Sequence, residues 1–292
     1  MAPGSDLVAG AWDLHVHAAP SLFERWGDVW DLAKVCQDTR MAGFLLKSHH
    51  GSSVESAALI DRKVPDLKVL GGLVLNQFVG GLNPFAVEAA IALGAKIVWL
   101  PTIHAAAHHA CFGILGSFPF QNAKVVQHPP EGIRILNDRN QLVSALLDIL
   151  EALNGRSVVL ATGHLSAEEI LVLHAFIRKQ KFDIRLLITH VFFKVPSLSV
   201  DQLRTMQSEQ TWFEVAHFSV FPNGNVTAAE VVARMQQLPA AHWILASDSG
   251  QQNNLHSPDA LAAFAVAVLE AGIPLTRVRR MLCDEPLHLL GI

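Results

Sequence analysis

The sequence predicts an α/β protein in which eight parallel strands close into a single (β/α)8 TIM-like barrel. Short apolar runs alternate with amphipathic helices throughout the chain, the pattern of strands covered on both faces. No Gly-x-Gly-x-x-Gly turn or Walker-type loop is present, which argues against an open nucleotide-binding sheet. No linker or shift in composition divides residues 1–292, so we expect one domain.

Each expected strand is a short run of apolar residues. The ranges are Ala11–Val16, Gly43–Ser48, Lys68–Leu75, Lys96–Thr102, Ser157–Thr162, Arg185–Thr189, Thr211–Ala216 and Trp243–Ser247. Because crossovers between parallel strands are right-handed, this alternation leaves two closures, an open doubly wound sheet or a barrel. The missing glycine-rich turn favours the barrel.

Start and stop signals bound the expected helices. Pro84 stands in the first turn of a helix that starts at Asn83 and ends at Gly94. Further helices are expected from Ser257 to Gly272 and from Thr276 to Leu290. The capping-box pattern, in which a hydroxyl and a glutamate satisfy the first amides, occurs in Ser52 with Glu55, Ser166 with Glu169 and Thr227 with Glu230.

The longest stretch without a regular pattern is 105–132, after the fourth expected strand. It is rich in glycine, proline, phenylalanine and histidine. Loops this long inside a compact domain usually have a function, so we expect an excursion over the barrel mouth. His108, His109 and His128 within it, like His50 in an earlier loop, are expected to face solvent.

Composition and charge exclude several classes of protein. With 51% hydrophobic and 16% charged residues the chain is not disordered, and a net charge of −4 argues against nucleic-acid binding. The longest apolar run, Ala260–Leu269, is about half a membrane span. It fits either a homo-oligomer surface or a deeply packed helix. The N-terminal residues lack a secretory signal, and three scattered cysteines favour a reducing cytoplasm.

Histidine and aspartate side chains end nearly every expected strand. His15 and His17 end the first one, and residues two apart in a strand share a face. Two such imidazoles can bind a divalent metal, although His-x-His also arises by chance among fifteen histidines. Polar residues at later strand ends are Lys47 and His49, His104, His164, His190, Glu214 and His217, and Asp248. In a barrel these ends meet at the active-site rim, which predicts a metal site.

Some rim residues have alternative interpretations. Asp248 could be a helix cap, but the next clear helix starts only near Ser257. Lys47 is expected to share a face with His49, and buried lysine is rare unless it is paired. Three interpretations of Lys47 stay open: a carbamylated bridging ligand, an ion-pair partner of the substrate, or a salt-bridged rim residue. Histidines that fall within or beside helices, and are expected to be structural, are His174, His242 and His288.

Other side chains near the strand ends predict the lining of a substrate pocket. The expected substrate contacts are Arg25, Asn76, His104, His217 and Glu214. Phe112, Phe118 and Phe120 either join this lining or pack between loops. A partly apolar pocket with a cationic contact would suit a small organic substrate that carries an acidic or polar group.

These residues together resemble the amidohydrolase superfamily of metal-dependent hydrolases. The resemblance rests on His-x-His after the first strand, His after the fifth and sixth, and Asp after the eighth. It runs from Asp13 to the closing MLCDEPLHLLG, which is similar to the Asn-Pro-Ala-x-Leu-Leu-Gly ending common in the superfamily. The segments LLKSHHG, GIRIL, LATGHLSAEE and LASDSGQ resemble an uncharacterised group of amidohydrolase-like proteins.

The resemblance implies a role for each matching residue. His15, His17 and Asp248 would hold one divalent ion, zinc with manganese or iron as alternatives. His164 and His190 would serve a second ion, or His164 would join a single ion while His190 assists the attacking water. Asp248 would also accept a proton during the reaction.

The chain departs from the superfamily in the position of its lysine. Two-metal members of the phosphotriesterase and dihydroorotase types carry a bridging carboxylated lysine on strand four. Here Lys96 lies at the start of that strand, far from the rim, and the rim lysine is Lys47 on strand two. The metal count stays open: Lys47 bridges from an unusual strand, the site holds one ion, or His49 or Glu214 supplies a ligand.

The predicted reaction is hydrolysis of an amide, lactone or ester by a metal-activated water, with a carboxylate as proton acceptor. A phosphoesterase of the PHP type is one alternative, although Asp248 is followed by Ser249 and Gly250 instead of the Asp-x-His usual there. A decarboxylase or hydratase on the same scaffold is another. The non-enzyme alternative is a metal-binding structural protein, but structural zinc sites are closed by four tightly spaced ligands.

Overall fold

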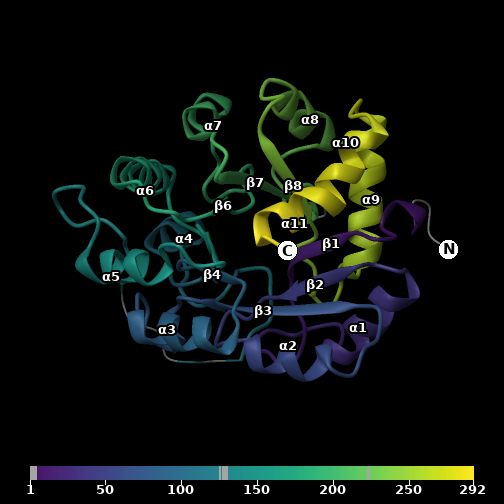
Figure 1. The fold of residues 1–292 in the computed structure, drawn as a ribbon, viewed down its shortest axis with the longest axis horizontal. Coiled ribbons are helices and arrows are strands. Elements are labelled where there is room, and N and C mark those ends of the chain that lie inside the picture. Colours follow the sequence, from purple (N-terminus) through teal and green to yellow (C-terminus); the bar gives the residue numbers. More distant parts are fainter. Residues whose placement is uncertain (1–4, 125, 127–130, 222–223) are drawn as a thin grey trace.

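The computed structural model describes residues 5–124, 126, 131–221 and 224–292, and it contains the predicted barrel (Figure 1). Eight parallel strands form one sheet in the order β1 to β8. Their bounds are β1 Trp12–Val16, β2 Gly43–Leu46, β3 Lys68–Val74, β4 Ile97–Trp99, β5 Val159–Ala161, β6 Leu186–Ile188, β7 Thr211–Ala216 and β8 His242–Ala246. All eight predicted strands are therefore confirmed.

The sheet closes because the segment after β8 pairs with β1. The amide of Asp248 donates to the carbonyl of His15 at 2.9 Å, and that of His17 donates to Ser249 at 2.8 Å. Several strands end earlier than predicted. Those expected to reach Ser48 and Thr102 stop at Leu46 and Trp99, because the chain turns there into the loops of the rim.

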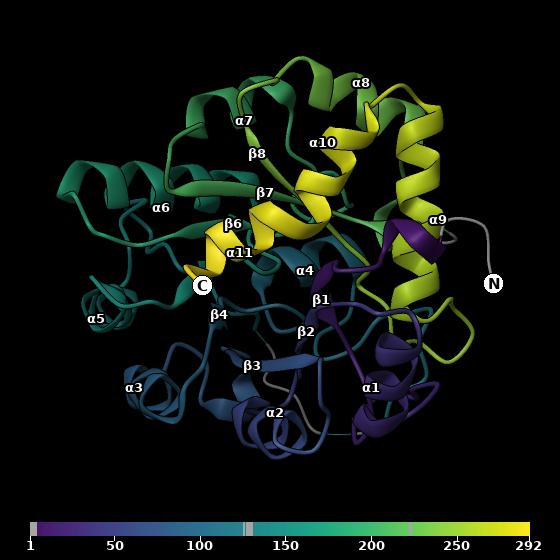
Figure 2. The same ribbon diagram turned by 45° about the vertical axis from the view of Figure 1, so that its right-hand side comes forward.

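Helices surround the strands, as the two views of the ribbon show (Figures 1 and 2). Their bounds are α1 Val29–Asp38, α2 Val54–Asp61, α3 Pro84–Leu93, α4 Ala106–Phe112, α5 Ser144–Leu153, α6 Ala167–Gln180, α7 Val200–Met206, α8 Ala228–Gln236, α9 Ser257–Glu270, α10 Leu275–Arg279 and α11 Glu285–Leu290. Short 3-10 turns cover Ser5–Leu7, Gln77–Val79 and His217–Ser219, and a π turn covers Arg280–Asp284. In the described part of the chain, no helix is both long and apolar enough to cross a membrane.

Most of the predicted helix signals are confirmed. The side chain of Asn83 caps α3, and Gly94 ends it in a left-handed conformation with φ 101°. Capping boxes start α6 and α8 as predicted. The box at Ser52 is wrong, because the N-cap of α2 is Ser53 and its side chain forms no cap bond. The Ser53 hydroxyl donates instead to the carbonyl of Leu46 at 2.6 Å, which ties α2 to β2.

Two predicted segments are more elaborate than expected. The last helix consists of α10, the π turn and α11 in succession, and Pro286, which lacks an amide hydrogen, lies just after that turn. The stretch 105–132 is not wholly irregular, because α4 occupies Ala106–Phe112. Residues 125 and 127–130 of this stretch, His128 among them, lie outside the described part of the chain.

The apolar core has two layers. Inside the barrel, side chains such as Leu14, Leu45 and Trp99 pack together, and Leu289 and Leu290 of α11 pack against them as a plug. The larger layer lies between the strands and the surrounding helices. In α9, Leu261, Phe264 and Val268 are completely buried in that layer, which accounts for its apolar sequence within a single chain.

Candidate active site

Three of the predicted metal ligands converge at the mouth of the barrel. His15 lies on β1, His17 follows it, and Asp248 lies two residues after β8 with a φ of 52°. The carboxylate Oδ1 of Asp248 is 3.2 Å from Nε2 of His15 and 3.2 Å from Nε2 of His17. Ligand atoms of the three residues all lie within 4.8 Å of one another. Two imidazole nitrogens and one carboxylate oxygen are a donor set typical of zinc-class ions.

Contacts behind the two histidines orient them toward Asp248. His15 Nδ1 lies 2.9 Å from Oε1 of Glu214, and His17 Nδ1 lies 2.8 Å from the carbonyl oxygen of Lys47. Because both partners accept, each Nδ1 carries the donated hydrogen, and the Nε2 atoms face the common centre. Metal-binding histidines are usually fixed in this way.

The centre also attracts positive charge. Burial alone would lower the pKa of His15, but the carboxylates of Asp248 and Glu214 outweigh it and raise that pKa to about 9. Burial lowers the pKa of His17 to about 3, helped by the charge of Arg25. The carboxylates of Asp248 and Glu214 therefore favour a positive charge at this position, and a metal cation would take the place of the proton on His15.

Asp13, which sequence reasoning did not single out, fastens β1 to β8 beneath this centre. Its buried carboxylate accepts hydrogen bonds from the hydroxyls of Ser247 and Ser257, both at 2.5 Å, and from the amide of Ser247 at 3.1 Å. Burial raises the pKa of Asp13, although these hydrogen bonds oppose the shift. The carboxylate thereby joins the strand that bears His15 to the start of α9.

Lys47 lies within the cluster and not on an open rim. Its side chain is 2% exposed, and its Nζ atom is 2.8 Å from Nε2 of His15 and 5.3 Å from the centre of the Trp99 ring. Burial lowers the pKa of Lys47 to about 8 against the attraction of Asp248 and Glu214. Among the described residues no carboxylate oxygen lies within 4.0 Å of Lys47 Nζ, which argues against the salt-bridged rim residue; the bridging-ligand and substrate-partner hypotheses stay open.

His164 and His190 lie beside the three converging residues. The ring of His190 is 6.0 Å from that of His15 and 5.0 Å from that of His164. Its Nδ1 atom is buried and has no hydrogen-bond partner in the described part of the chain. Gly163 permits the sharp turn before His164, since its φ is +59° and a Cβ would meet the carbonyl oxygen of Leu100 at 2.3 Å.

His108, expected to face solvent, is instead buried against His164. Helix α4 forms where a loop was expected, and it points the His108 ring inward, where Nδ1 is 2.9 Å from Nδ1 of His164. The His108 Nε2 atom lies 2.8 Å from the carbonyl of Ser117, to which it must donate, so its Nδ1 accepts from His164. This chain leaves Nε2 of His164 as the free lone pair. Exposed His109 agrees with the prediction, and His50 is half-buried.

A small cavity lies at the centre of these side chains. Its lining comprises His15, His17, Arg25, Lys47, His49, Phe118, Gln121, His164, Phe193, Phe218, Asp248 and Gln251. Its volume of about 10 Å³ is close to the least that holds one water molecule. Gln121, Phe218 and Gln251 also line an outer pocket of about 340 Å³, so they separate the inner centre from a space of ligand size.

Arg25 and Lys47 are the cationic side chains among the residues that line the inner cavity. In the described residues, no carboxylate oxygen lies within 4.0 Å of the Arg25 guanidinium, and its Nε atom is 3.4 Å from the Ser21 hydroxyl. Burial lowers the pKa of Arg25 to about 10, while Asp248 opposes the shift. A half-buried guanidinium without a carboxylate partner is well suited to hold an anionic group of a ligand.

The other predicted substrate contacts are placed differently. Asn76 is completely buried, where its amide donates to the carbonyl of His49 and the hydroxyl of Thr102, so it shapes the rim from below. Glu214 is also completely buried, behind His15. Neither residue lines the inner cavity, and their contact with a substrate stays a prediction. His104 and His217 are buried too and do not line the inner cavity. His49 does line it, stacked on His17 at 4.6 Å.

Comparison with solved structures confirms the fold that the sequence resemblance implied. Similar structures include an amidohydrolase from Pseudomonas aeruginosa, with 10% identity, a TM-score of 0.63 and coverage of 98% of this chain and 97% of that one. The inactive dihydroorotase-like domain of a CAD-like multifunctional protein from Chaetomium thermophilum has 12% identity, a TM-score of 0.59 and coverage of 98% and 80%. A β-aspartyl dipeptidase from Fervidobacterium islandicum AW-1 has 13% identity and a TM-score of 0.56, with coverage of 97% of this chain and 75% of that one.

The chain therefore has a (β/α)8 barrel fold that is similar to the folds of these proteins. The chain belongs to the family of unknown function DUF6282, whose model matches residues 10–214. That range includes His15, His17, Lys47, His164 and His190, whereas Asp248 lies beyond it. No curated protein matches the sequence.

Proposed function

We propose that this protein is a metal-dependent hydrolase that uses water to cleave an amide, lactone or ester bond of a small organic substrate. The observation that carries the proposal is the convergence of His15, His17 and Asp248, whose ligand atoms lie within 4.8 Å of one another beside a small buried cavity. The site lies at the carboxyl ends of the strands, where enzymes of this fold have their catalytic residues.

The donor atoms fit a divalent ion. Besides the three converging residues, the buried Nδ1 atom of His190 and the buried Oε2 atom of Glu214 have no hydrogen-bond partner in the described part of the chain. Zinc suits two imidazoles and a carboxylate, with manganese or iron as alternatives. One ion would be held by His15, His17 and Asp248. A second would need His164 and His190, with Lys47 as the candidate bridge. A bound ion of this class supplies a Lewis acid and acidifies a coordinated water.

The chain's own residues supply proton transfer and orientation. Burial would raise the pKa of Asp248, but the charge of the facing His15 and its hydrogen bond lower that pKa well below the ordinary value. The carboxylate is therefore ionised and able to accept a proton at its free oxygen. His190, whose backbone amide donates to Glu214 at 3.0 Å, lies beside this point and would orient the attacking water.

The walls of the cavity suggest the kind of substrate. Arg25 would hold an acidic or other anionic group, while Phe118, Phe193 and Phe218 form apolar walls that limit water. Beyond them, side-chain amides line the outer pocket: Gln121, Asn122, Gln251, Gln252, Asn253 and Asn254. Amide groups both donate and accept, so this outer pocket would hold the polar part of a substrate.

The cysteines support a cytoplasmic location for this activity. Cys36, Cys111 and Cys283 are all free thiols, as expected in a reducing compartment. The thiol of Cys36 is buried, and burial raises its pKa well above the ordinary value, so it is unreactive. A homo-oligomer stays a prediction of the sequence.

Metal analysis combined with a hydrolysis assay tests the proposal. The native protein and a His15→Ala/His17→Ala variant would be compared for zinc, manganese and iron per chain and for hydrolysis of a panel of amides, lactones and esters. We expect the native protein to bind one or two equivalents of metal more than the variant and to turn over a member of the panel, and the variant to lose that turnover. Because one similar structure is described as inactive, the assay is essential. Absence of metal after reconstitution would refute the proposal.

A further inference from the structure

A second cluster of metal-competent side chains lies at the opposite end of the barrel. His242 is the first residue of β8, Glu285 is the first residue of α11, and His288 lies one helical turn further. Oε2 of Glu285 is 3.1 Å from Nδ1 of His242 and 3.8 Å from Nδ1 of His288. Ligand atoms of the three residues all lie within 4.8 Å of one another. Sequence reasoning assigned both histidines a structural role.

These separations match those between ligands of one ion. Two atoms bonded to zinc at about 2.0–2.1 Å in tetrahedral geometry are about 3.3 Å apart. The Glu285–His242 and Glu285–His288 distances lie on either side of that value. The side chains therefore need little movement to share an ion. Two imidazoles with one carboxylate favour a borderline transition ion over calcium or magnesium, which prefer oxygen ligands.

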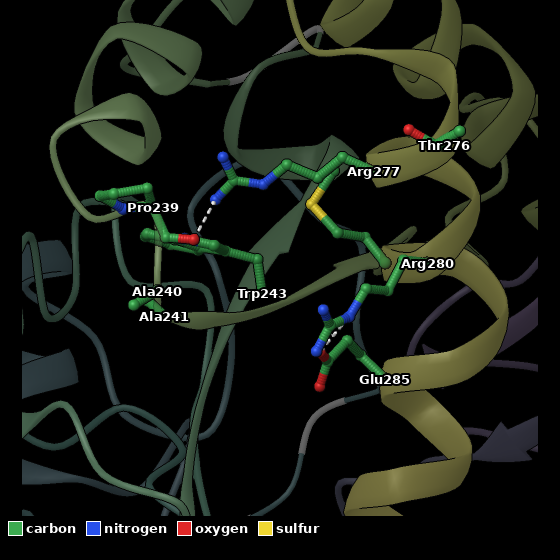
Figure 3. Close-up of a pocket in the computed structure, with 9 residues that line it drawn as sticks. Pro239, Ala240, Ala241, Trp243, Thr276, Arg277, Arg280 and Glu285 are labelled. Carbon is green, nitrogen blue, oxygen red and sulfur yellow. Dashed lines mark hydrogen bonds and ion pairs between the residues drawn. The ribbon is translucent and has the colours of Figure 1, made fainter.

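Neighbouring residues hold the Glu285 carboxylate in place. The indole nitrogen of Trp212 donates to Oε2 at 2.9 Å. The guanidinium of Arg280 contacts the other oxygen, Oε1, at 2.7 Å (Figure 3). Arg280 therefore occupies the oxygen that faces away from the histidines. The oxygen that faces them accepts from Trp212 and from Nδ1 of His242, and an ion would take the place of the His242 hydrogen. Such outer contacts to a carboxylate are common around metal ligands.

The cluster is accessible to an ion from solvent. The side chain of His288 is 57% exposed, whereas that of Glu285 is 4% exposed. Glu285 and Arg280 also line a cavity of about 380 Å³ between the loop 239–241 and the C-terminal helices (Figure 3). Because the His288 side chain is largely exposed, a water molecule can complete the coordination from that side.

We propose that His242, Glu285 and His288 bind one divalent transition ion of the zinc class, and that this ion fastens α11 to β8. Leu289 and Leu290, next to His288, plug the barrel interior from this end. An ion that joins the first residue of β8 to the helix carrying the plug would therefore stabilise the closed barrel. This site is separate from the proposed hydrolase centre, and its existence does not depend on that activity.

Zinc binding to the full chain tests the site. The protein would be stripped with a chelator, dialysed against zinc chloride, and analysed for zinc per chain and for its Tm. We expect His288→Ala to bind about one equivalent fewer than the wild type and to lose part of the rise in Tm that zinc causes. His109→Ala, which removes an exposed histidine from α4, is the matched control and should bind as the wild type does.

A location experiment completes the test and does not require a variant. Anomalous diffraction at the zinc edge from crystals of the wild-type protein should give a peak between His242, Glu285 and His288. Equal zinc content in wild type and His288→Ala, or zinc peaks that leave this position empty, would overturn the proposal. Failure of the hydrolase centre to bind metal would not alter the difference between the two proteins.

Discussion

Nδ1 of His15 lies 2.9 Å from Oε1 of Glu214, and both side chains are buried. The same carboxylate oxygen accepts the backbone amide of His190 at 3.0 Å. One buried carboxylate on β7 therefore positions a candidate ligand on β1 and the backbone of another after β6. Burial raises the pKa of Glu214, but the charge of His15 and its hydrogen bond outweigh this effect and lower it. The carboxylate is consequently ionised behind the site.

Glu214→Gln tests this relationship. The amide oxygen of glutamine can still accept from His15, but the negative charge is lost. Removing such an outer partner typically weakens metal binding by about 10–100-fold, so we expect a decrease of that size in zinc affinity. Competition with a chromogenic chelator would measure it. An exposed glutamate, Glu151, provides the control Glu151→Gln. Unchanged affinity in Glu214→Gln would show that Glu214 only fills space.

Asp248→Asn is expected to remove most turnover and preserve the fold. Asp248 has a φ of 52°, a conformation that asparagine tolerates better than most residues, so the backbone should not change. The amide cannot accept the proton as the carboxylate does, and we expect kcat to fall by about 100-fold or more. Circular dichroism and Tm would verify the fold, with exposed Asp259→Asn as the matched control. Near wild-type kcat would disprove the proton-acceptor role.

Because His217 is buried, we expect the free energy of unfolding to decrease in mild acid. Burial lowers the pKa of this histidine to about 4 in the folded chain, whereas an unfolded histidine titrates near about 6.5. Between these values the unfolded state binds more protons, so the free energy of unfolding decreases as pH falls. The contribution between pH 7 and pH 5 is about 2 kcal/mol.

Urea unfolding of wild type and His217→Leu at pH 7 and pH 5 measures that contribution. The variant lacks the titrating ring, so its stability should decrease less over this interval. His109→Leu changes an exposed histidine and serves as the control. The same pH dependence in wild type and His217→Leu would contradict a buried, neutral His217.

The sequence was sufficient to predict the barrel and much of the rim because both depend on local patterns. Apolar runs mark the strands, and in a parallel barrel every strand end meets the same rim. His15, His17 and Asp248 were predicted together for this reason, and the structure brings them together. The contact of Glu214 with His15 had a signal in the sequence: a single acidic residue inside the apolar strand TWFEVA is expected to be buried and to need a partner.

Contacts between distant segments could not be predicted in the same way. His108 and His164 are 56 positions apart, and Asp13 and Ser257 are 244 apart. Nothing in the sequence near His108 indicates that α4 points its ring inward, because that direction depends on how 105–132 folds against the rim. Asp13 and the inward-facing ring of His108, which support the site through such contacts, are therefore features that sequence reasoning missed.

His108 gives the most specific prediction about these supporting residues. Its Nε2–H donates to the carbonyl of Ser117, so its Nδ1 accepts from Nδ1 of His164 and leaves Nε2 of His164 free to bind a metal. Burial lowers the pKa of His108 to about 4, which keeps this arrangement neutral at pH 7. His108→Leu removes the acceptor, and we expect metal affinity to fall by about 10–100-fold.

The conservative variant His108→Gln separates hydrogen bonding from packing. Glutamine can accept from His164 through its oxygen and donate to Ser117 through its nitrogen, so it should recover part of the affinity that His108→Leu loses. His109→Leu, one position along α4 and exposed, should bind metal as the wild type does. Equal losses in the leucine and glutamine variants would mean that the imidazole acts by its shape. No loss in either would mean that His164 needs no partner, which would remove His108 from the site.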